Sequence, residues 1–368
     1  MKARRALRPQ ENLPQETGRV RVMVVEDSPV IRNLLGFIIA ADPRLEVCGA
    51  VPSGEAAIEA IPLLRPDVIS MDIRLPGIDG LEATRIIMSR YPTPIVVIAD
   101  AVEDRSLHIS MNALRSGALS VVEKPAGFAH ADHAVIADTI RTQLYIMSQV
   151  PVIRQRDVNR PGMMAEPSLG EERRRLRPAM AAIVASTGGP AALARVLGGL
   201  PLDFPLPILV VQHMGAAFMT GFAEWLDGLV RLPVGIATHG QTPLAGQVHV
   251  APGDQHMSVA ADGRLRLSRE APVHNQRPSG TILFQSMARA LGPRGLGVLL
   301  TGMGEDGAEG MLAMRQAGAM TITEDESTAV VYGMPASAVK LGASGLALPL
   351  DRIAPAILHA TAPEGEHW

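Results

Sequence analysis

The segment AAIVASTGGPAALA, residues Ala181–Ala194, runs from a short apolar stretch through Ser186 and two glycines into an alanine-rich stretch. The apolar stretch has the length and composition of a buried β-strand, and alanine-rich sequence favours an α-helix. A strand that turns directly into a helix is the basic unit of α/β proteins. The segment therefore predicts an α/β fold. It also leaves a question about Ser186, because a hydroxyl at this junction can cap a helix or act as a nucleophile.

The same alternation of apolar runs and helical segments continues from Met180 towards the C-terminus. Turn sequences, APGDQ and ADGR, join the middle strands and are typical of β-hairpins. We expect a C-terminal α/β domain over residues 179–362, with a mainly parallel sheet and a β-hairpin insertion. The expected strands are MAAIVA (180–185), LPILVVQ (206–212), LPVGIA (232–237), QVHVAP (247–252), HMSVA (256–260), RLRLS (264–268), LGVLL (296–300), AMTIT (319–323) and GLALPL (345–350).

The N-terminal half shows the same rhythm with more regular spacing, which predicts a doubly wound parallel sheet over residues 19–148. Cys48 lies in one of its strands, and we interpret it as a core residue. The expected strands are VRVMVV (20–25), LEVCGAV (45–51), PDVISM (66–71), PIVVIA (94–99) and ALSVVE (118–123). The expected helices are SPVIRNLLGFIIA (28–40), GEAAIEAIPLL (54–64), GLEATRIIMSR (80–90), RSLHISMNALRSG (105–117) and a fifth over 132–148.

Composition limits the classes of function. The 368 residues carry a net charge of -3 and only 3% aromatic side chains, which argues against a nucleic-acid-binding surface. A single cysteine excludes an internal disulfide and fits a reducing compartment. No apolar run approaches the ~20 residues of a membrane span, and the basic residues 1–18 lack the apolar core of a secretory signal. We therefore expect a cytoplasmic protein with a disordered N-terminal tail and no membrane insertion.

Residues 149–178 are rich in Arg, Pro and Glu and show no sustained apolar period, which is typical of a linker between domains. The run ERRRLR within it could contact nucleic acid. A solvated charged linker is the interpretation that we favour, because charge runs are usually solvent-facing.

Acidic residues cluster at the strand ends of the N-terminal half. Glu26 and Asp27 follow the first strand, Asp72 follows the third, and Lys124 ends the fifth. Ligands bind beyond the carboxyl ends of the strands in an open parallel sheet. Three converging carboxylates would repel one another unless a cation such as Mg²⁺, which prefers oxygen ligands, lay among them. Any one of these residues alone would be explained as a helix cap or a solvated loop charge.

The motifs VVEDS (24–28), MDIRLPGIDG (71–80) and VEKP (122–125) resemble those of the response-regulator receiver domain, which has a flavodoxin-like fold. The resemblance implies that Asp72 accepts phosphate from a histidine kinase of the CheA type. It also implies Mg²⁺ on Glu26, Asp27, Asp72 and the backbone carbonyl of Arg74, with Lys124 contacting the phosphoryl group. Two positions depart from the pattern: Ala99 stands where a Ser or Thr is usual, and Val121 where an aromatic residue is common.

Three chemically active residues follow strands in the C-terminal half: Ser186, His213 and Asp306. Parallel strands would bring them to one sheet edge, where a histidine can activate a serine while a carboxylate orients it. Each also has a structural alternative. Ser186 and Asp306 could cap helices, and His213 could be a hydrogen-bonded structural histidine. The other candidate bases are His249 and His256, which we expect in the hairpin region.

The C-terminal motifs resemble the catalytic domain of the chemotaxis protein-glutamate methylesterases, the CheB family. They are ASTGGP (185–190), VVQHM (210–214), HVAPGDQHM (249–257), RPS (277–279), LFQSMA (283–288), LLTGMGEDGAEGMLAMRQAGA (299–319) and YGMPASA (332–338). The resemblance implies Ser186 as nucleophile, His213 as base and Asp306 as its orienter. Thr187 and the backbone N–H of Met303 would line the oxyanion site, and the esterase would need no cofactor.

Two further positions depart from the CheB pattern. Val184 stands where a glycine is usual before AS, and Gly280–Thr281 follow RPS where the family often has Val-Asp. The resemblance implies a phosphorylation-regulated serine esterase of chemotaxis, acting on glutamyl methyl esters, and on glutamine amides, of methyl-accepting chemoreceptors. The rival hypothesis is a non-catalytic response regulator whose C-terminal domain binds receptor or kinase partners. Methanol release from methylated receptor membranes distinguishes the two.

Overall fold

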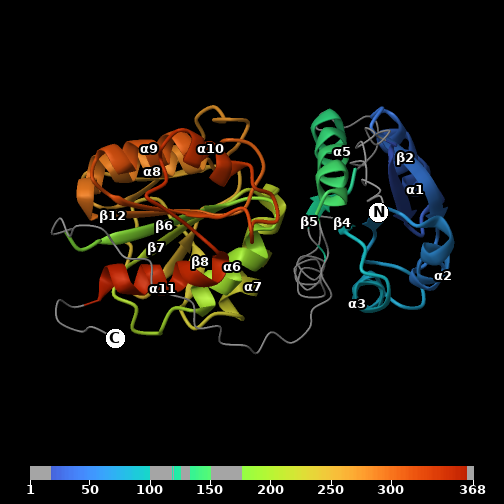
Figure 1. The fold of residues 1–368 in the computed structure, drawn as a ribbon, viewed down its shortest axis with the longest axis horizontal. Helices are drawn as coiled ribbons and strands as arrows, with labels where there is room; N and C mark the ends of the chain where they lie inside the picture. The colour runs from blue at the N-terminus through green and yellow to red at the C-terminus, as the bar shows by residue number, and fades with distance from the viewer. Residues whose placement is uncertain (1–17, 100–117, 119, 126–132, 151–175, 363–368) are drawn as a thin grey trace, which may run out of the picture.

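Two α/β domains follow one another in the computed structural model, which describes residues 18–99, 118, 120–125, 133–150 and 176–362 (Figure 1). The predicted helix over 105–117, nearly all of the predicted tail and most of the predicted linker lie outside these residues. In the described part of the chain, no helix combines the length and the apolar character that crossing a bilayer requires.

The N-terminal domain is built on a five-stranded parallel sheet with the order β2-β1-β3-β4-β5. Its strands are β1 (Val20–Val25), β2 (Leu45–Val51), β3 (Val68–Met71), β4 (Ile95–Ala99) and β5 (Ser120–Glu123). Its described helices are α1 (Pro29–Ala40), α2 (Gly54–Leu64), α3 (Gly80–Arg90) and α5 (His133–Ser148). This confirms the predicted doubly wound fold.

Alternate residues of the central strands enter two separate cores, one on each face of this sheet. Val22 and Val24 pack with α1 and α5, whereas Met23 and Val25 pack on the other face with α2 and α3. Burial on both faces explains why the strands read as continuous apolar runs. Cys48 is partly buried against the α2–α3 core, as predicted.

The C-terminal domain is built on a seven-stranded sheet with the order β14-β13-β12-β6-β7-β9-β8, and its neighbouring strands are parallel throughout. Its strands are β6 (Met180–Ala185), β7 (Ile208–Gln212), β8 (Val234–Ile236), β9 (Val248–Val250), β12 (Gly295–Leu299), β13 (Met320–Glu324) and β14 (Leu346–Leu348). Its helices are α6 (Gly189–Gly198), α7 (Met219–Asp227), α8 (Gly280–Leu291), α9 (Ala308–Gln316), α10 (Met334–Lys340) and α11 (Leu350–Thr361).

Helices cover both faces of this sheet, which makes three layers (Figure 1). The central strand β6 shows how the sequence divides between the layers. Ile183 and Ala185 face the core under α6, α7 and α11, while Ala182 and Val184 face the core under α8, α9 and α10. The strand is therefore apolar along its whole length.

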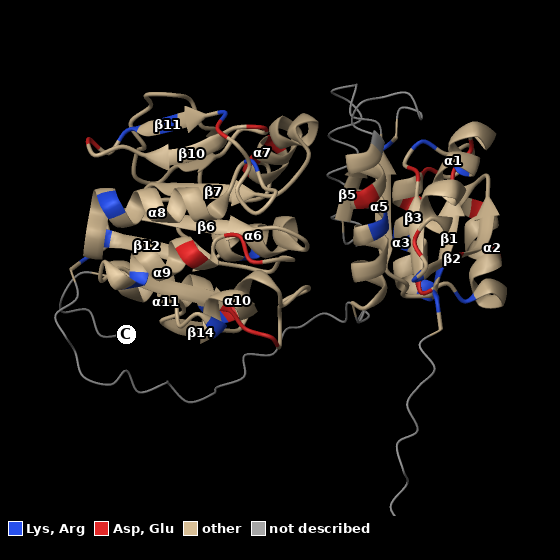
Figure 2. Ribbon diagram, turned by 90° about the horizontal axis from the view of Figure 1, so that it is seen from above, with Lys and Arg blue, Asp and Glu red and all other residues tan. Residues whose placement is uncertain are grey.

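One hairpin prediction is correct and the other is wrong. Strands β10 (His256–Val259) and β11 (Leu265–Ser268) form an antiparallel pair around ADGR and pack on α8, outside the main sheet (Figure 2). The segment APGDQ, in contrast, connects β9 to β10 across two different sheets. Because β9 pairs in parallel with both β7 and β8, His249 lies inside the main sheet and not in the hairpin region.

The carboxyl ends of β6 and β7 point towards the N-terminal domain, whose β5 and α5 lie on the side that faces them (Figure 1). Ser186 and His213 are the first residues after these two strands. The fold thus brings the predicted site residues of the C-terminal half to the side of the domain that faces the other domain.

Candidate active sites

His213 and Asp306 form a buried pair at this edge of the main sheet. His213 Nε2 lies 2.8 Å from Asp306 Oδ2, and the two side chains are 4% and 2% exposed. His213 Nδ1 is also buried and has no hydrogen-bond partner among the described residues. Since Asp306 holds Nε2, Nδ1 is the nitrogen that remains to accept a proton.

Asp306 is held in place from the start of α8 as well as by His213. Its Oδ1 accepts hydrogen bonds from the Ser279 hydroxyl (2.6 Å) and the Thr281 N–H (3.1 Å), and its Oδ2 accepts one from the Gly280 N–H (2.6 Å). Burial alone would raise the pKa of Asp306, but the hydrogen bonds from His213, Ser279 and Gly280 hold it well below its usual value. Asp306 is therefore a fixed carboxylate that favours one tautomer of His213.

Ser279 is a site residue that the sequence did not predict. Its hydroxyl also caps α8, accepting a hydrogen bond from the Ile282 N–H. The Thr281 hydroxyl accepts a hydrogen bond from the Gly307 N–H (2.8 Å), which ties the turn after Asp306 to the same helix. The residues Gly280–Thr281, which depart from the family pattern, thus contact the orienting carboxylate.

Ser186 does not cap the helix that follows it. The N-cap of α6 is Gly188, in the left-handed region at φ 78°, and no side chain caps this helix. The Ser186 N–H instead donates to the Thr301 carbonyl (3.0 Å), and the Gln212 side-chain amide donates to the Ser186 carbonyl (2.8 Å). Asp306 likewise does not cap the helix that follows it, because the N-cap of α9 is Gly307. Its carboxylate instead accepts the first N–H groups of α8, a helix that lies earlier in the chain.

Ser186 Oγ makes no hydrogen bond to His213 within the described chain, since His213 Nδ1 is unpartnered. The backbones of the two residues are nevertheless adjacent, because the His213 N–H donates to the Ala185 carbonyl at 3.0 Å. The two side chains thus leave neighbouring parallel strands at the same level.

The rival histidines have other partners. His249 is buried in β9 with its Nδ1 3.2 Å from the Gln241 amide, and burial lowers the pKa of this imidazole. His256 Nδ1 accepts a hydrogen bond from the Ser279 N–H (3.2 Å), and its Nε2 lies 3.1 Å from the Ala271 carbonyl. His249 Nε2 has no hydrogen-bond partner among the described residues, but His249 is in register with Leu209 within the sheet and does not follow a strand end as His213 does. His213 is therefore the histidine that we assign to Ser186.

Thr187 and Met303 are the two residues that we expect to line an oxyanion site. Thr187 is buried, and its hydroxyl accepts a hydrogen bond from the side-chain amide of Gln143 on α5 of the N-terminal domain (3.3 Å). Met303 lies in the loop after β12 and is 48% exposed. Val121 of β5 also packs against the core of the C-terminal domain, and Val331 packs against that of the N-terminal domain. The two domains therefore touch next to Ser186.

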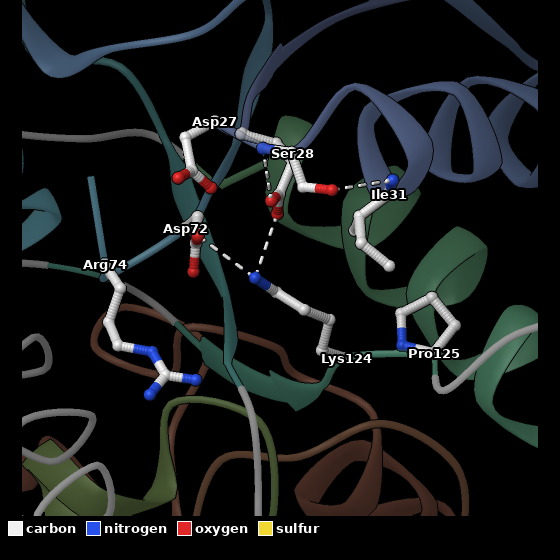
Figure 3. A pocket seen from close by; sticks show the side chains of 8 residues that line it. Asp27, Ser28, Ile31, Asp72, Arg74, Lys124 and Pro125 are labelled. Atoms are coloured by element: carbon white, nitrogen blue, oxygen red, sulfur yellow. Dashed lines mark hydrogen bonds and ion pairs between the residues drawn. The ribbon is translucent and has the colours of Figure 1, made fainter. Parts of the chain in front are cut away.

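A second site lies at the carboxyl edge of the N-terminal sheet, in a pocket of about 400 Å³ (Figure 3). Lys124 Nζ lies 3.0 Å from both Glu26 Oε2 and Asp72 Oδ2. Oxygen atoms of Glu26, Asp27 and Asp72 come within 4.8 Å of one another. Arg74 also lines the pocket, with its side chain extended away from the carboxylates. The structure thus brings together the four acidic and basic residues predicted here.

The electrostatics of this pocket favour a bound cation. Burial, followed by repulsion from Asp72, raises the pKa of Glu26 to about 7, and burial also raises the pKa of Asp72. Burial alone would lower the pKa of Lys124, but Asp72 and Glu26 raise it. Converging oxygen ligands with raised pKa values are the donor set that a hard cation would stabilise, so these residues fit Mg²⁺.

Comparison with known proteins assigns both domains of the chain to known families. Residues 181–357 match the family model of the CheB methylesterase, and residues 22–136 match that of the response regulator receiver domain. The protein-glutamate methylesterase/protein-glutamine glutaminase 2 of Paramagnetospirillum magneticum is 53% identical over 91% of this chain and 96% of its own length. The chain belongs to the CheB family.

Other CheB relatives extend the comparison. The protein-glutamate methylesterase/protein-glutamine glutaminase of Nitrosospira multiformis is 42% identical over 94% of this chain and 98% of its own. The crystal structure of the Thermotoga maritima CheB methylesterase catalytic domain is 34% identical, covers 50% of this chain and 99% of its own, and has a TM-score of 0.48.

The two departures from the CheB pattern in the C-terminal domain contact each other. A Cβ atom added at Gly280 would lie 2.4 Å from Cγ1 of Val184. The side chain of Val184 therefore fills the space beside Gly280, and a side chain at position 280 would collide with it. The Gly280 N–H still donates to Asp306.

Proposed function

We propose that this protein is a phosphorylation-regulated protein-glutamate methylesterase with protein-glutamine glutaminase activity. The observation that carries the proposal is the buried His213–Asp306 pair with its unpartnered Nδ1, on a histidine whose backbone N–H bonds the residue before Ser186. Membership of the CheB family supports it, as do relatives named for both activities over nearly their whole length.

In the proposed reaction, Ser186 Oγ attacks the carbonyl carbon of a glutamyl methyl ester while His213 Nδ1 accepts its proton. Asp306 stabilises the imidazolium through Nε2. Thr187 and the Met303 N–H would hold the developing oxyanion. Methanol leaves with the proton from His213, and water then releases glutamate from Ser186. A glutamine amide would follow the same course with ammonia as the leaving group.

The N-terminal domain would regulate this site. Glu26, Asp27, Asp72 and the Arg74 carbonyl would hold Mg²⁺, which supplies charge neutralisation for phosphoryl transfer to Asp72. Lys124 lies 3.0 Å from Asp72 and is placed to contact the phosphoryl group. The acidic, partly buried pocket supports this assignment.

Contact between the domains supports autoinhibition in the unphosphorylated state. The Gln143 amide of α5 donates a hydrogen bond to the Thr187 hydroxyl and so holds the N-terminal domain against the residue that follows Ser186. Receptor access to Ser186 would then require that α5 and β5 move away, and phosphorylation of Asp72 would favour that movement. The expected partners are methyl-accepting chemoreceptors and a CheA-type histidine kinase, and the expected location is the cytoplasm.

Methanol release tests this proposal against the non-catalytic alternative. Purified protein, with a small phosphodonor and Mg²⁺, is added to membranes that carry receptors with radiolabelled methyl esters. We expect labelled methanol from the wild type and none above background from Ser186→Ala. Tight binding to receptor or kinase without methanol release would favour the non-catalytic response regulator instead.

A further inference from the structure

The same sheet holds a buried carboxyl group that the proposed reaction does not use. Glu324 ends β13, two strands away from β6 in the sheet, and its side chain is completely buried. Its Oε2 accepts a hydrogen bond from the Thr301 N–H at 2.8 Å. Burial raises the pKa of Glu324 to about 6. Since a buried carboxyl is costly, its position calls for a reason other than packing.

Thr301 connects this carboxyl to the catalytic turn. It is completely buried just after β12, the strand between β13 and β6. Its carbonyl accepts the Ser186 N–H (3.0 Å), and its hydroxyl donates to the Thr187 carbonyl (2.9 Å). The same hydroxyl accepts the Val331 N–H (2.8 Å) and lies 3.3 Å from the Val331 carbonyl, a longer contact than that to the Thr187 carbonyl. One residue thus holds the backbone of both Ser186 and Thr187.

We infer that Glu324 is a positioning residue for the esterase: through Thr301 it fixes the turn that carries the nucleophile and Thr187. The chain of contacts crosses three adjacent strands, β13, β12 and β6, without a gap. The role needs a hydrogen-bond acceptor at Glu324 and does not need a negative charge. A neutral acceptor of the same shape should therefore serve, whereas an apolar side chain of the same size should not.

The test compares Glu324→Met with Glu324→Gln in the full-length protein, with methanol release measured under phosphodonor. This inference rests on the proposed esterase function. We expect Glu324→Met to lower kcat about 10- to 100-fold with KM within twofold of wild type, because small displacements of a nucleophile are costly. Glu324→Gln should retain kcat within about threefold.

The matched control is Thr321→Val on the same strand. Thr321 is buried, and its hydroxyl donates to the Ala343 carbonyl, away from Ser186. This variant should lower the melting temperature and leave kcat unchanged. Equal kcat for Glu324→Met and wild type would overturn the inference, as would a loss in Glu324→Gln as large as that in Glu324→Met. An inactive wild type would refute the proposed function itself.

Discussion

At the scale of single residues, the exchange between Val184 and Gly280 explains two departures with one contact. Each residue taken alone is an unexplained departure from the CheB pattern. Together they conserve volume, because the valine side chain of β6 fills the space that Gly280 leaves at the start of α8.

This contact predicts strong coupling between the two positions. Gly280→Val should destabilise the domain by about 1–3 kcal/mol through overpacking, and Val184→Gly by about 2–4 kcal/mol through a cavity and a flexible strand residue. The double variant Val184→Gly with Gly280→Val should recover most of the loss. Urea unfolding measures all three, and losses that simply add would show that the side chains do not share one space.

Glu324 gives a pH dependence of stability with a definite sign. Its folded pKa of about 6 lies above the ordinary value of 4.5, so the folded state binds the proton more tightly than the unfolded state. The contribution of Glu324 to stability is therefore fully present below pH 4.5 and is lost as the pH rises through 6. Relative to Glu324→Gln, the wild type should lose about 2 kcal/mol between pH 4 and pH 8. A difference between the two proteins that stays constant over this range in urea unfolding would contradict the shift.

At the scale of helices and strands, apolar periodicity was sufficient for most of the fold. All described strands and helices of the N-terminal domain lie within the predicted segments, because a parallel sheet buried on both faces gives continuous apolar runs. The placement of β9 failed because a three-residue buried strand before APGDQ resembles a hairpin arm. Sequence alone does not state which sheet such a strand joins.

Some site residues were predictable from the sequence and others were not. Ser186 and His213 were predictable because each directly follows a parallel strand. Ser279 was missed because its cap role hides its bond to Asp306, a contact between distant parts of the chain. Glu324 was also missed, although it ends a parallel strand and the same rule applied to β13 would have drawn attention to it.

Helix α5 predicts a specific effect on basal activity. Gln143→Met keeps the side-chain size but removes the hydrogen bond to Thr187, so unphosphorylated turnover should rise about 2- to 10-fold. The matched control is Gln149→Met, which should be neutral, since the Gln149 amide bonds the neighbouring Ser148 hydroxyl and no other side chain among the described residues. Methanol release without phosphodonor is the measurement. Unchanged basal turnover in Gln143→Met would remove this contact from the inhibitory mechanism.

At the scale of the whole molecule, the two positions that depart from the receiver pattern, Ala99 and Val121, bear on how strongly we expect phosphorylation to act on the C-terminal domain. Ala99 is buried and has no hydroxyl to meet a phosphoryl group on Asp72. Val121 has no ring to move, yet it packs against the core of the esterase domain as well as its own. We therefore expect any effect of phosphorylation on the C-terminal domain to involve β5.

Ala99→Thr should strengthen activation by phosphorylation. A hydrogen bond to a charged phosphoryl group contributes roughly 1.5–3 kcal/mol to the active state, which corresponds to about 10- to 150-fold in the equilibrium between the two states. Asp72 should be labelled equally by a small phosphodonor in both proteins, because labelling needs only the metal site and Lys124. The ratio of turnover with and without phosphodonor is the readout. Strong activation of the wild type, with no gain in Ala99→Thr, would show that this domain signals by another route.

The central claim, that Ser186, His213 and Asp306 act as one catalytic unit, is tested most directly by kcat for methanol release from Ser186→Ala, His213→Ala and the double variant. Each single change should lower kcat by at least ~10³, and the double variant should be little worse than either alone, since the serine has no activated attack without its base. Circular dichroism checks that each variant is folded. Losses that multiply in the double variant, or a single variant with near-normal kcat, would contradict the account.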